Sequence, residues 1–347
     1  MANMPHGVWG HQKFLVQRTN RHMLQSTPYP ETASTRTKWI RALREPTSRP
    51  GALSSPATLV EQEMGAEGSL LKTATIFLIN RECPWTCVMC DLWKHTTLEP
   101  MSPGHAPVQL NSALRQLEKA SEHRISQIKI YNSGSFFDTK AIYTADYMRI
   151  ANALSGYDRI IVENHPKLSG KHISLFKELL APQLEIAMGL EVADDPLLDK
   201  LNKRFSLKDY MTACEFLNEQ SIAHRAFIMV QPPFTGQAEA LNLCQKSVRF
   251  AFEQKASCVS LIPSRATTGA MHALKNQGYF AQPTIHTLES CFTHALQMNR
   301  GRVFVDLWDL EMFSECKVCF ELRHARFQQM NQFQKILPEI QCPMCQP

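Results

Sequence analysis

The sequence contains no stretch near the roughly 18 consecutive apolar residues that a membrane-spanning helix requires. It also lacks a short apolar core followed by a small-residue cleavage site, which argues against a secretory signal. Neither an internal repeat nor a low-complexity segment is present. Its 347 residues, 44% of them hydrophobic, are typical of a soluble globular protein. We therefore expect a cytoplasmic protein with no membrane contact, built from one large domain plus an appendage or from two domains.

Acidic residues are scarce at the start of the chain, where the first is Glu31. Residues 1–50 hold eight Lys and Arg against two Glu, whereas the net charge of the whole chain is +5, so the remainder is close to neutral. The eight basic residues are Lys13, Arg18, Arg21, Arg36, Lys38, Arg41, Arg44 and Arg49. A basic arm on a neutral body favours contact with a polyanion such as RNA. The alternative is a solvated, partly disordered tail.

The chain has eleven cysteines, and seven of them fall into two clusters. Disulfides would suit an oxidising compartment, but short-spaced clusters in a reducing cytosol are typical of metal sites. Because no export signal is evident, we expect metal binding. The remaining four, Cys214, Cys244, Cys258 and Cys291, fall on apolar faces and are predicted to be small core residues.

Regular structure is predicted from residue 74 onward. Apolar runs indicate six buried strands and a short seventh, at Thr75–Asn80, Gln127–Tyr131, Arg159–Glu163, Glu185–Leu190, His224–Val230, Cys258–Ile262 and Arg302–Leu307. Amphipathic helices fall between them, one of them beginning with a capping box formed by Ser206 and Asp209. This alternation indicates an α/β fold with a parallel sheet and right-handed crossovers. Its length favours a partial (β/α)6 barrel over a full eight-unit barrel.

The pattern divides the chain into three parts. Residues 1–70 are predicted to form a basic, partly disordered arm with a short helix around Trp39–Leu43. Residues 71–308 are predicted to form the core barrel. Residues 309–347 are predicted to form a small Cys-rich, metal-binding extension.

Cys83, Cys87 and Cys90 form a C-x3-C-x2-C motif directly after the first predicted strand. Active sites of such barrels lie at the carboxyl ends of the strands. Three thiolates from one loop suit a four-iron cluster with one iron left open for a substrate or cosubstrate. The alternative is a zinc ion with His95 as fourth ligand, although C-x3-C is not a usual spacing for structural zinc.

On this motif, and over roughly residues 74–308, the sequence resembles the radical S-adenosylmethionine (SAM) superfamily. The resemblance implies a [4Fe–4S] cluster on the three cysteines, with an open iron that chelates SAM. It also implies reductive cleavage of SAM to a 5′-deoxyadenosyl radical, with electrons from a reductase or a flavodoxin- or ferredoxin-type donor. Met89 stands where the family usually has an aromatic residue near the adenine, and its polarizable side chain can fill that place. No catalytic residue is assigned.

Three further segments resemble SAM-binding features of the family. Ser133, Gly134 and Ser135 form a small-residue turn after the second strand, like the family's turn that contacts the SAM amino group. Glu191 ends a G-L-E segment. Lys203 stands where a basic residue meets the SAM carboxylate in the elongator-catalytic-subunit and methylthiotransferase branch. Ordinary roles remain open, since Glu191 can cap the next helix and Lys203 can be a surface residue.

Loop segments at strand ends resemble the radical SAM partner of archaeosine synthesis: Y-N-S-G-S-F-F-D, E-N-H-P, M-G-L-E, I-M-V-Q-P-P-F and L-I-P-S-R-A-T-T-G-A-M. This implies a tRNA base or a modified nucleoside as substrate. A small-molecule or peptide substrate remains open, as does a non-catalytic, zinc-containing RNA-binding protein, because one fold serves many reactions. Polar residues at or next to strand ends are candidates to line the pocket: Glu163, His165, Arg225, Gln231, Ser264 and Arg265.

The extension supplies four more cysteines in the pairs C-K-V-C and C-P-M-C, namely Cys316, Cys319, Cys342 and Cys345. Two such knuckles provide four ligands for one tetrahedral metal ion. The intervening Phe320–Ile340 is predicted to be a helix that brings the knuckles together. Structural zinc and an auxiliary iron–sulfur cluster are both compatible with the spacing, and a pair of disulfides is the third alternative.

Overall fold

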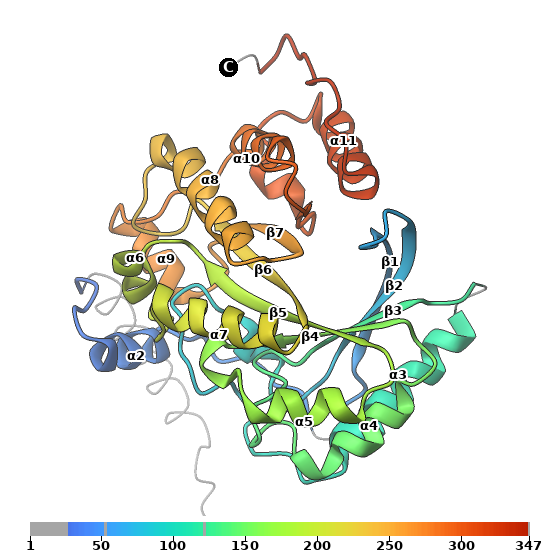
Figure 1. The fold of residues 1–347 in the computed structure, drawn as a ribbon. Helices are drawn as coiled ribbons and strands as arrows, with labels where there is room; N and C mark the ends of the chain where they lie inside the picture. Colours follow the sequence, from blue (N-terminus) through green and yellow to red (C-terminus); the bar gives the residue numbers. More distant parts are fainter. Residues whose placement is uncertain (1–26, 52–53, 121–122, 346–347) are drawn as a thin grey trace, which may run out of the picture.

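Eight strands form one curled sheet in the computed structural model, which describes residues 27–51, 54–120 and 123–345 (Figure 1). The strands lie in chain order; β1 is antiparallel to β2, and every later neighbour is parallel. They are β1 Ala57–Met64, β2 Leu70–Phe77, β3 Gln127–Tyr131, β4 Arg159–Asn164, β5 Gln183–Glu191, β6 Ala223–Val230, β7 Cys258–Pro263 and β8 Arg302–Val305. The result is an open half-barrel, so the predicted partial barrel is confirmed.

The strands predicted from apolar runs are present as β2 to β8, although β2 begins and ends earlier than predicted. β1 was not predicted, because it lies in the segment expected to be an arm. Half of the residues in its sequence, A-T-L-V-E-Q-E-M, are polar, and Glu63 is its one buried residue. It therefore lacks the alternation of buried apolar residues by which a strand is recognised in sequence.

Helices connect the parallel strands and cover the outer face of the sheet (Figure 1). They are α3 His105–Ala120, α4 Tyr147–Ala153, α5 Lys171–Leu179, α6 Asp195–Lys200, α7 Leu207–Glu219, α8 Gln237–Glu253, α9 Gly269–Asn276 and α10 Ile285–Gln297, with 3-10 turns η1 Leu92–His95, η2 Thr144–Asp146, η3 Pro166–Leu168 and η4 Leu310–Phe313. The predicted capping box is present, since Ser206 and Asp209 exchange hydrogen bonds at the start of α7. Among the described residues, no helix has both the length and the apolar character needed to cross a membrane.

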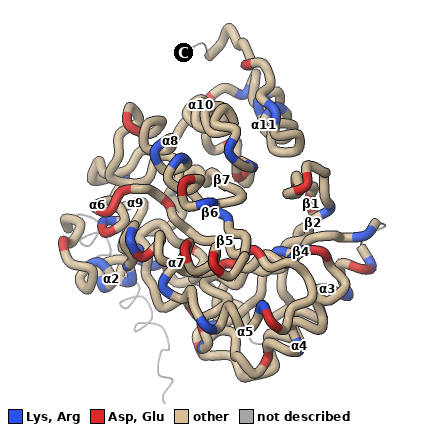
Figure 2. The backbone as a smooth tube through the Cα atoms, viewed as in Figure 1, with Lys and Arg blue, Asp and Glu red and all other residues tan. Residues whose placement is uncertain are grey.

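Part of the expected arm is folded onto the barrel. α2 (Ala33–Ala42) buries Trp39 and Ile40, and Arg36 Nη1 donates to the Asp199 carboxylate at 2.8 Å. The short helix predicted around Trp39–Leu43 is present as part of α2, and β1 is a second regular element within the segment that was predicted to be a partly disordered arm. Figure 2 shows the basic residues of α2 on this side of the molecule. The basic residues 13, 18 and 21 lie outside the described part of the chain.

The contact between α2 and α9 leaves no room for a side chain at Gly269. A Cβ there would lie 2.1 Å from the backbone carbonyl oxygen of Leu43, just after α2. We therefore expect Gly269→Ala to lower the free energy of unfolding by about 1–3 kcal/mol, measured by urea denaturation. Gly156→Ala is the control, because a Cβ at Gly156 meets no atom within 4 Å. Equal stability of the two variants would contradict the docking of α2 on α9.

The amino ends of the parallel strands enclose a buried network of charged side chains. Arg225 on β6 bonds Glu185 on β5 at 2.5 Å and Glu63 on β1 at 3.0 Å, and Lys129 on β3 also pairs with Glu63. Burial alone would raise the pKa of Glu63, but the charges of Arg225 and Lys129 hold it below its usual range. Arg225, a candidate pocket residue, instead belongs to this network at the end of the barrel opposite the cysteine motif.

α11 (Phe320–Phe333) covers the free edge of β8 and also contacts β1. The Gln334 amide accepts from the Val303 N–H at 2.7 Å and donates to the Val303 carbonyl at 2.8 Å. Asn331 makes the same pair of bonds with Val305, both at 2.8 Å. These side-chain amides replace a neighbouring strand at an edge that would otherwise invite pairing with another chain. The helix ends earlier than the predicted Phe320–Ile340.

Candidate functional site

The cysteine loop (residues 83–90) follows β2 at the carboxyl end of the parallel strands. Residues just after α6 hold this loop in place. The Leu201 carbonyl accepts a hydrogen bond from the Val88 N–H at 3.1 Å, and Asn202 Nδ2 donates to the Thr86 carbonyl at 2.6 Å. The loop is therefore fixed by tertiary hydrogen bonds at the place where active sites of barrels form.

Cys83, Cys87 and Cys90 are partly buried free thiols, close enough for electrostatic interaction. Burial raises the pKa of all three thiols, and the positive charge of Lys203 opposes this rise at Cys87. A bound metal would reverse the effect of burial, because a coordinating thiol is deprotonated outright. Three thiols from one loop match the donor set of a four-iron cluster that keeps one open iron.

His95, considered above as a fourth zinc ligand, is exposed at the end of η1. Within the residues that the structure describes, the one group of three or more His, Cys, Asp or Glu ligand atoms lying within 4.8 Å of one another is that of the tail cysteines. The exposed position of His95 gives no support to a zinc site on the cysteine loop, and the C-x3-C spacing is also unusual for structural zinc.

The turn after β3 lies against the cysteine loop. A Cβ on Gly134 would sit 3.3 Å from the Cβ of Cys83, and Ser133 has a left-handed φ of 55°. Glu163, near the end of β4, accepts hydrogen bonds from the N–H groups of Asn132 and Gly134. Burial raises the pKa of Glu163 to about 7, although these N–H groups act in the opposite direction. Glu163 therefore stabilises the conformation of this turn through hydrogen bonds to its backbone.

Trp85 of the cysteine loop stacks on His165, with ring centroids 3.6 Å apart and an interplanar angle of 6°. The His165 ring is fixed at both nitrogens, because Nδ1 accepts from the Lys167 N–H and Nε2 bonds the Lys203 carbonyl at 3.0 Å. Ser135 Oγ accepts from the His165 backbone N–H at 2.9 Å. Burial lowers the pKa of His165 to about 3, so the ring is neutral near pH 7. His165 thus supports the loop, and no sequence signal pointed to its contact with Trp85.

Lys203 and Glu191 form an ion pair of 2.8 Å between side chains that are 9% and 13% exposed. Gly189 makes room for this pair, since a Cβ there would lie 2.5 Å from the Glu191 carboxylate and 3.1 Å from the Lys203 ammonium. The hydrogen bonds that Leu201 and Asn202 make with the cysteine loop place the pair beside this loop. Lys203 is not a surface residue, because it is buried. Glu191 does not cap the following helix, because Asp194 is the N-cap residue of α6.

The remaining candidates have varied surroundings. Met89 packs, partly buried, against the core. Gln231 and Ser264 donate to backbone carbonyls of neighbouring loops and strands, which indicates structural roles. Arg265 pairs with Asp306 at 2.9 Å after the ends of β7 and β8, so it stays at the rim of the barrel on the side of the cysteine loop.

Aromatic rings line the inside of the barrel toward the same end. Tyr131 on β3 and Phe227 on β6 have centroids 6.1 Å apart, although β4 and β5 separate their strands in the sheet. Their contact therefore crosses the barrel interior. Phe77 lies 6.2 Å from Tyr131 and 6.1 Å from Trp308. These rings could not be recognised as site residues from the sequence, because an aromatic residue at the end of an apolar strand is usually part of the core.

The tail cysteines come together although their two pairs are far apart in sequence. The four Sγ atoms of Cys316, Cys319, Cys342 and Cys345 lie within 4.8 Å of one another. Cys316 and Cys342 are 3.9 Å apart, and Cys319 and Cys345 are 3.4 Å apart. The donor set predicted for the extension is therefore assembled.

No protein-family model matches this chain. It is 25% identical over 260 residues to archaeosine synthase subunit beta of Methanosarcina acetivorans, a match that covers 72% of each chain. The solved Elp3 of Methanocaldococcus infernus, with an N-terminal deletion, superposes with a TM-score of 0.50 at 15% identity over 67% of this chain. The superposition spans 62% of that Elp3 chain, just under two thirds. A radical SAM methyltransferase of Sphaerobacter thermophilus gives a TM-score of 0.49 at 16% identity over 73% of this chain and 76% of its own.

Proposed function

We propose that this chain is a radical SAM iron–sulfur enzyme that reductively cleaves SAM and acts on a base or modified nucleoside of tRNA. The C-x3-C-x2-C motif and the similarity to archaeosine synthase subunit beta support this proposal. Cys83, Cys87 and Cys90 would hold the [4Fe–4S] cluster. When reduced and bound to SAM, that cluster would supply the chemistry of a 5′-deoxyadenosyl radical for hydrogen abstraction from the substrate. The observation that carries the proposal is the convergence of the cysteine loop, the turn at residues 132–135 and the Glu191–Lys203 pair.

The residues around the loop have distinct roles in this proposal. The turn of Ser133, Gly134 and Ser135 binds the SAM amino group, and the buried ammonium of Lys203 binds its carboxylate. Glu191 keeps Lys203 charged and oriented before SAM enters. Met89 packs near the adenine.

Three features support a tRNA substrate. The first is the similarity to archaeosine synthase subunit beta. The second is the set of aromatic rings inside the barrel, because their faces suit stacking with a planar base. The third is a pocket of about 410 Å³ that Cys83 lines together with Arg41, Arg44, Arg81 and Glu82. Although Glu82 pairs with Arg44 at 2.7 Å, the pocket keeps a net positive charge, which suits a phosphate backbone. A cytoplasmic enzyme with a reductase or a flavodoxin- or ferredoxin-type electron donor completes the proposal.

The test of the reaction is anaerobic reconstitution with iron and sulfide, followed by addition of dithionite and SAM. We expect about four irons per chain at the cysteine loop and release of 5′-deoxyadenosine, measured by chromatography. A protein that binds no iron and releases no 5′-deoxyadenosine would contradict the proposed function. It would favour the non-catalytic, zinc-containing alternative.

The test of the substrate compares modified tRNA nucleosides from a deletion strain and its parent by mass spectrometry. Loss of one modified nucleoside, or accumulation of its precursor, is the expected result. An unchanged nucleoside profile in a strain that lacks an active enzyme would contradict the tRNA substrate. A small molecule or peptide would then take its place.

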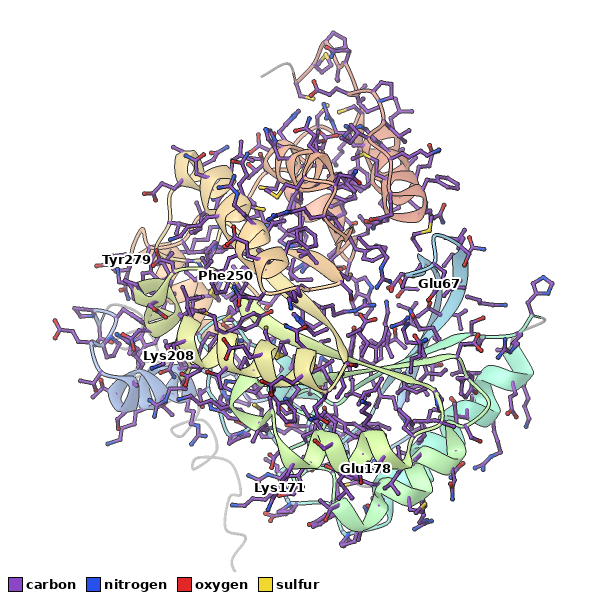
Figure 3. All side chains as sticks on the ribbon, viewed as in Figure 1. Glu67, Lys171, Glu178, Lys208, Phe250 and Tyr279 are labelled. Carbon is purple, nitrogen blue, oxygen red and sulfur yellow. The ribbon has the colours of Figure 1, made fainter. Side chains whose placement is uncertain are left out.

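Replacement of Lys203 should weaken SAM binding more than it slows a saturated enzyme. A hydrogen bond to a charged group contributes about 1.5–3 kcal/mol, so Lys203→Met should raise the SAM concentration for half-maximal cleavage by roughly 10- to 100-fold. Lys208→Met is the control, because Lys208 is exposed on α7 (Figure 3). An equal half-maximal concentration for both variants would exclude Lys203 from the SAM site.

A further inference from the structure

We infer that the four tail cysteines bind a single zinc ion and that this ion fastens α11 over the open edge of the barrel. A zinc ion with Zn–S distances of about 2.3 Å holds four thiolates at the corners of a tetrahedron, about 3.8 Å apart. The Sγ separations of 3.9 Å for Cys316–Cys342 and 3.4 Å for Cys319–Cys345 bracket this value, and no pair in the group exceeds 4.8 Å. The site therefore has the size of one tetrahedral ion.

The same distances favour zinc over the two alternatives that the spacing of the motif left open. A disulfide requires sulfur atoms about 2.05 Å apart, and all four cysteines are free. An iron–sulfur cluster spreads its thiolates over two or four irons with sulfide between them. Four Sγ atoms gathered around one point do not provide that space.

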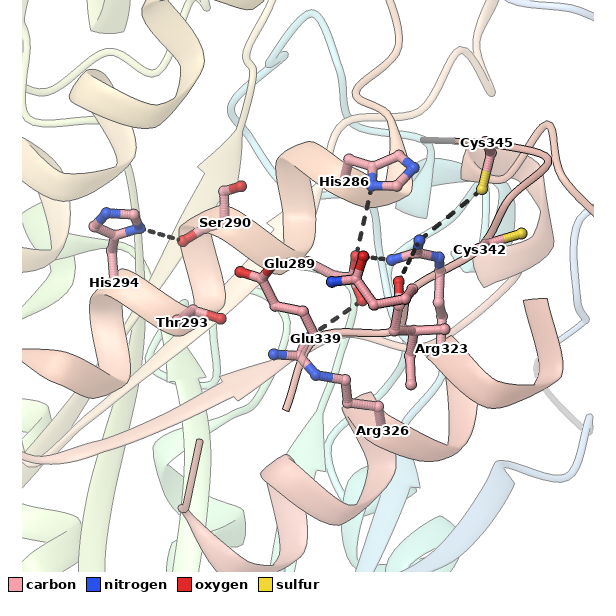
Figure 4. Close-up of a pocket in the computed structure, with 12 residues that line it drawn as sticks. His286, Glu289, Ser290, Thr293, His294, Arg323, Arg326, Glu339, Cys342 and Cys345 are labelled. Carbon is pink, nitrogen blue, oxygen red and sulfur yellow. Dashed lines mark hydrogen bonds and ion pairs between the residues drawn. The ribbon is translucent and has the colours of Figure 1, made fainter. Parts of the chain in front are cut away.

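The charges next to the site complement a zinc–thiolate centre. Arg323, with a side chain 4% exposed, donates from Nε to Cys319 Sγ at 3.2 Å and from Nη2 to Cys345 Sγ at 3.9 Å. Arg323 and Arg326 both pair with Glu289 of α10 (Figure 4). Two guanidinium groups and one carboxylate leave one positive charge in excess. Four thiolates around Zn²⁺ carry a net charge of −2. This negative charge would compensate the buried positive charge of Arg323.

The site is connected directly to the helix that covers β8. Cys319 is the N-cap residue of α11, and the returning chain is held along the helix because Arg326 donates to the carbonyls of Leu337 and Pro338. Arg323 likewise donates to the Ile340 carbonyl at 3.1 Å. Zinc would connect the start of α11, at Cys316 and Cys319, to the end of the segment that runs back along the helix, at Cys342 and Cys345. It thereby fixes the helix whose far end supplies the amide side chains for the edge of β8.

Metal analysis of the full-length protein tests the identity of the ion. We expect one zinc per chain in the wild type and in a triple variant, Cys83→Ala, Cys87→Ala and Cys90→Ala, which removes the other proposed metal site. Cys342→Ser should lose this zinc. Iron bound to the tail of the triple variant, or no metal there at all, would overturn the inference. Neither outcome depends on the proposed enzymatic function.

Arg323→Met tests the role of the neighbouring charge while keeping all four cysteines. Removal of a partner that hydrogen-bonds metal ligands typically costs 10- to 100-fold in affinity, so we expect zinc affinity to fall by about that factor in competition with a chelator. Arg300→Met is the control, since Arg300 is an exposed residue before β8. Equal zinc affinity in both variants would show that Arg323 does not support the site.

Hydrogen exchange tests the link to the barrel edge. When zinc is removed by a chelator, the amides of Val303 and Val305 should exchange roughly tenfold faster or more, because their partners on α11 are released. Amides in the middle of the sheet, such as that of Ala226 on β6, should keep their protection. Unchanged exchange at Val303 and Val305 after complete zinc loss would overturn the fastening role.

Discussion

Cys87→Ala should reduce 5′-deoxyadenosine formation to the level of a control without enzyme. Three thiolates leave one open iron on a four-iron cluster, so Cys87→Ala would remove one of the three protein ligands that the proposed cluster requires. Iron content after anaerobic reconstitution should fall together with activity. The measurement combines iron analysis, absorbance of the reconstituted protein and chromatography of the SAM products.

Cys244→Ala is the matched control for this loss. Cys244 is a free thiol buried on α8, and its packing is that of a small core residue. Its replacement should reduce stability modestly and leave iron content and SAM cleavage per folded chain close to the wild type. Equal activity of Cys87→Ala and the wild type would refute the assignment of the cluster to the cysteine loop.

Glu185→Gln should be the most destabilising change in the buried charge network. Glu185 is fully buried and pairs with Arg225 at 2.5 Å, Arg159 at 3.3 Å and Arg302 at 3.7 Å. A neutral amide at this position removes the negative charge that compensates the three arginines, which remain buried in the barrel. Breaking a buried ion pair from one side costs about 3–5 kcal/mol, which urea denaturation should detect as a large shift in midpoint.

Asp158→Asn provides the comparison at the surface. Asp158 pairs with Arg124 at 2.6 Å, but the two side chains are 55% and 64% exposed, so its loss should cost less than about 1 kcal/mol. If both variants unfold at the same urea concentration, the buried network contributes no more than a surface pair.

The effect of Glu185→Gln should also depend on pH. Although burial alone would raise the pKa of Glu185, the charges of Arg225 and Arg302 hold it below its ordinary value. The stabilisation is therefore fully present above the unfolded-state pKa of about 4.3 and is lost as the pH falls through the lower folded-state pKa. The stability difference between wild type and variant should be constant near neutral pH and shrink only in strong acid.

The sequence was sufficient to predict elements whose signals are local. The apolar runs of β2 to β8, the Ser206–Asp209 capping box and the C-x3-C-x2-C motif are each contained in a short segment. β1 was missed because it is a polar edge strand whose main buried side chain is a charged one, Glu63. Its place in the fold depends on Lys129 and Arg225, which are distant in sequence.

The candidate site shows the same division between local and long-range signals. The cysteines could be found from their spacing, and the small-residue turn from its resemblance to a family feature at the end of a predicted strand. The stacking of Trp85 on His165 and the ring contacts of Tyr131 across the barrel could not, because each joins residues of separate strands or loops. Arg225 could not be distinguished from a pocket residue in sequence, since only the curvature of the sheet brings it to Glu63.

The hydrogen bonds from Leu201 and Asn202 to the cysteine loop have a thermodynamic consequence for the proposed cofactors. The residue that follows them is Lys203, so a cluster that orders the loop would also restrict the backbone that carries this side chain. Such coupling between two bound groups is reciprocal: the factor by which the cluster tightens SAM binding is the factor by which SAM tightens retention of the cluster. Under the proposed function, bound SAM would therefore slow cluster loss, and depletion of either cofactor would weaken binding of the other.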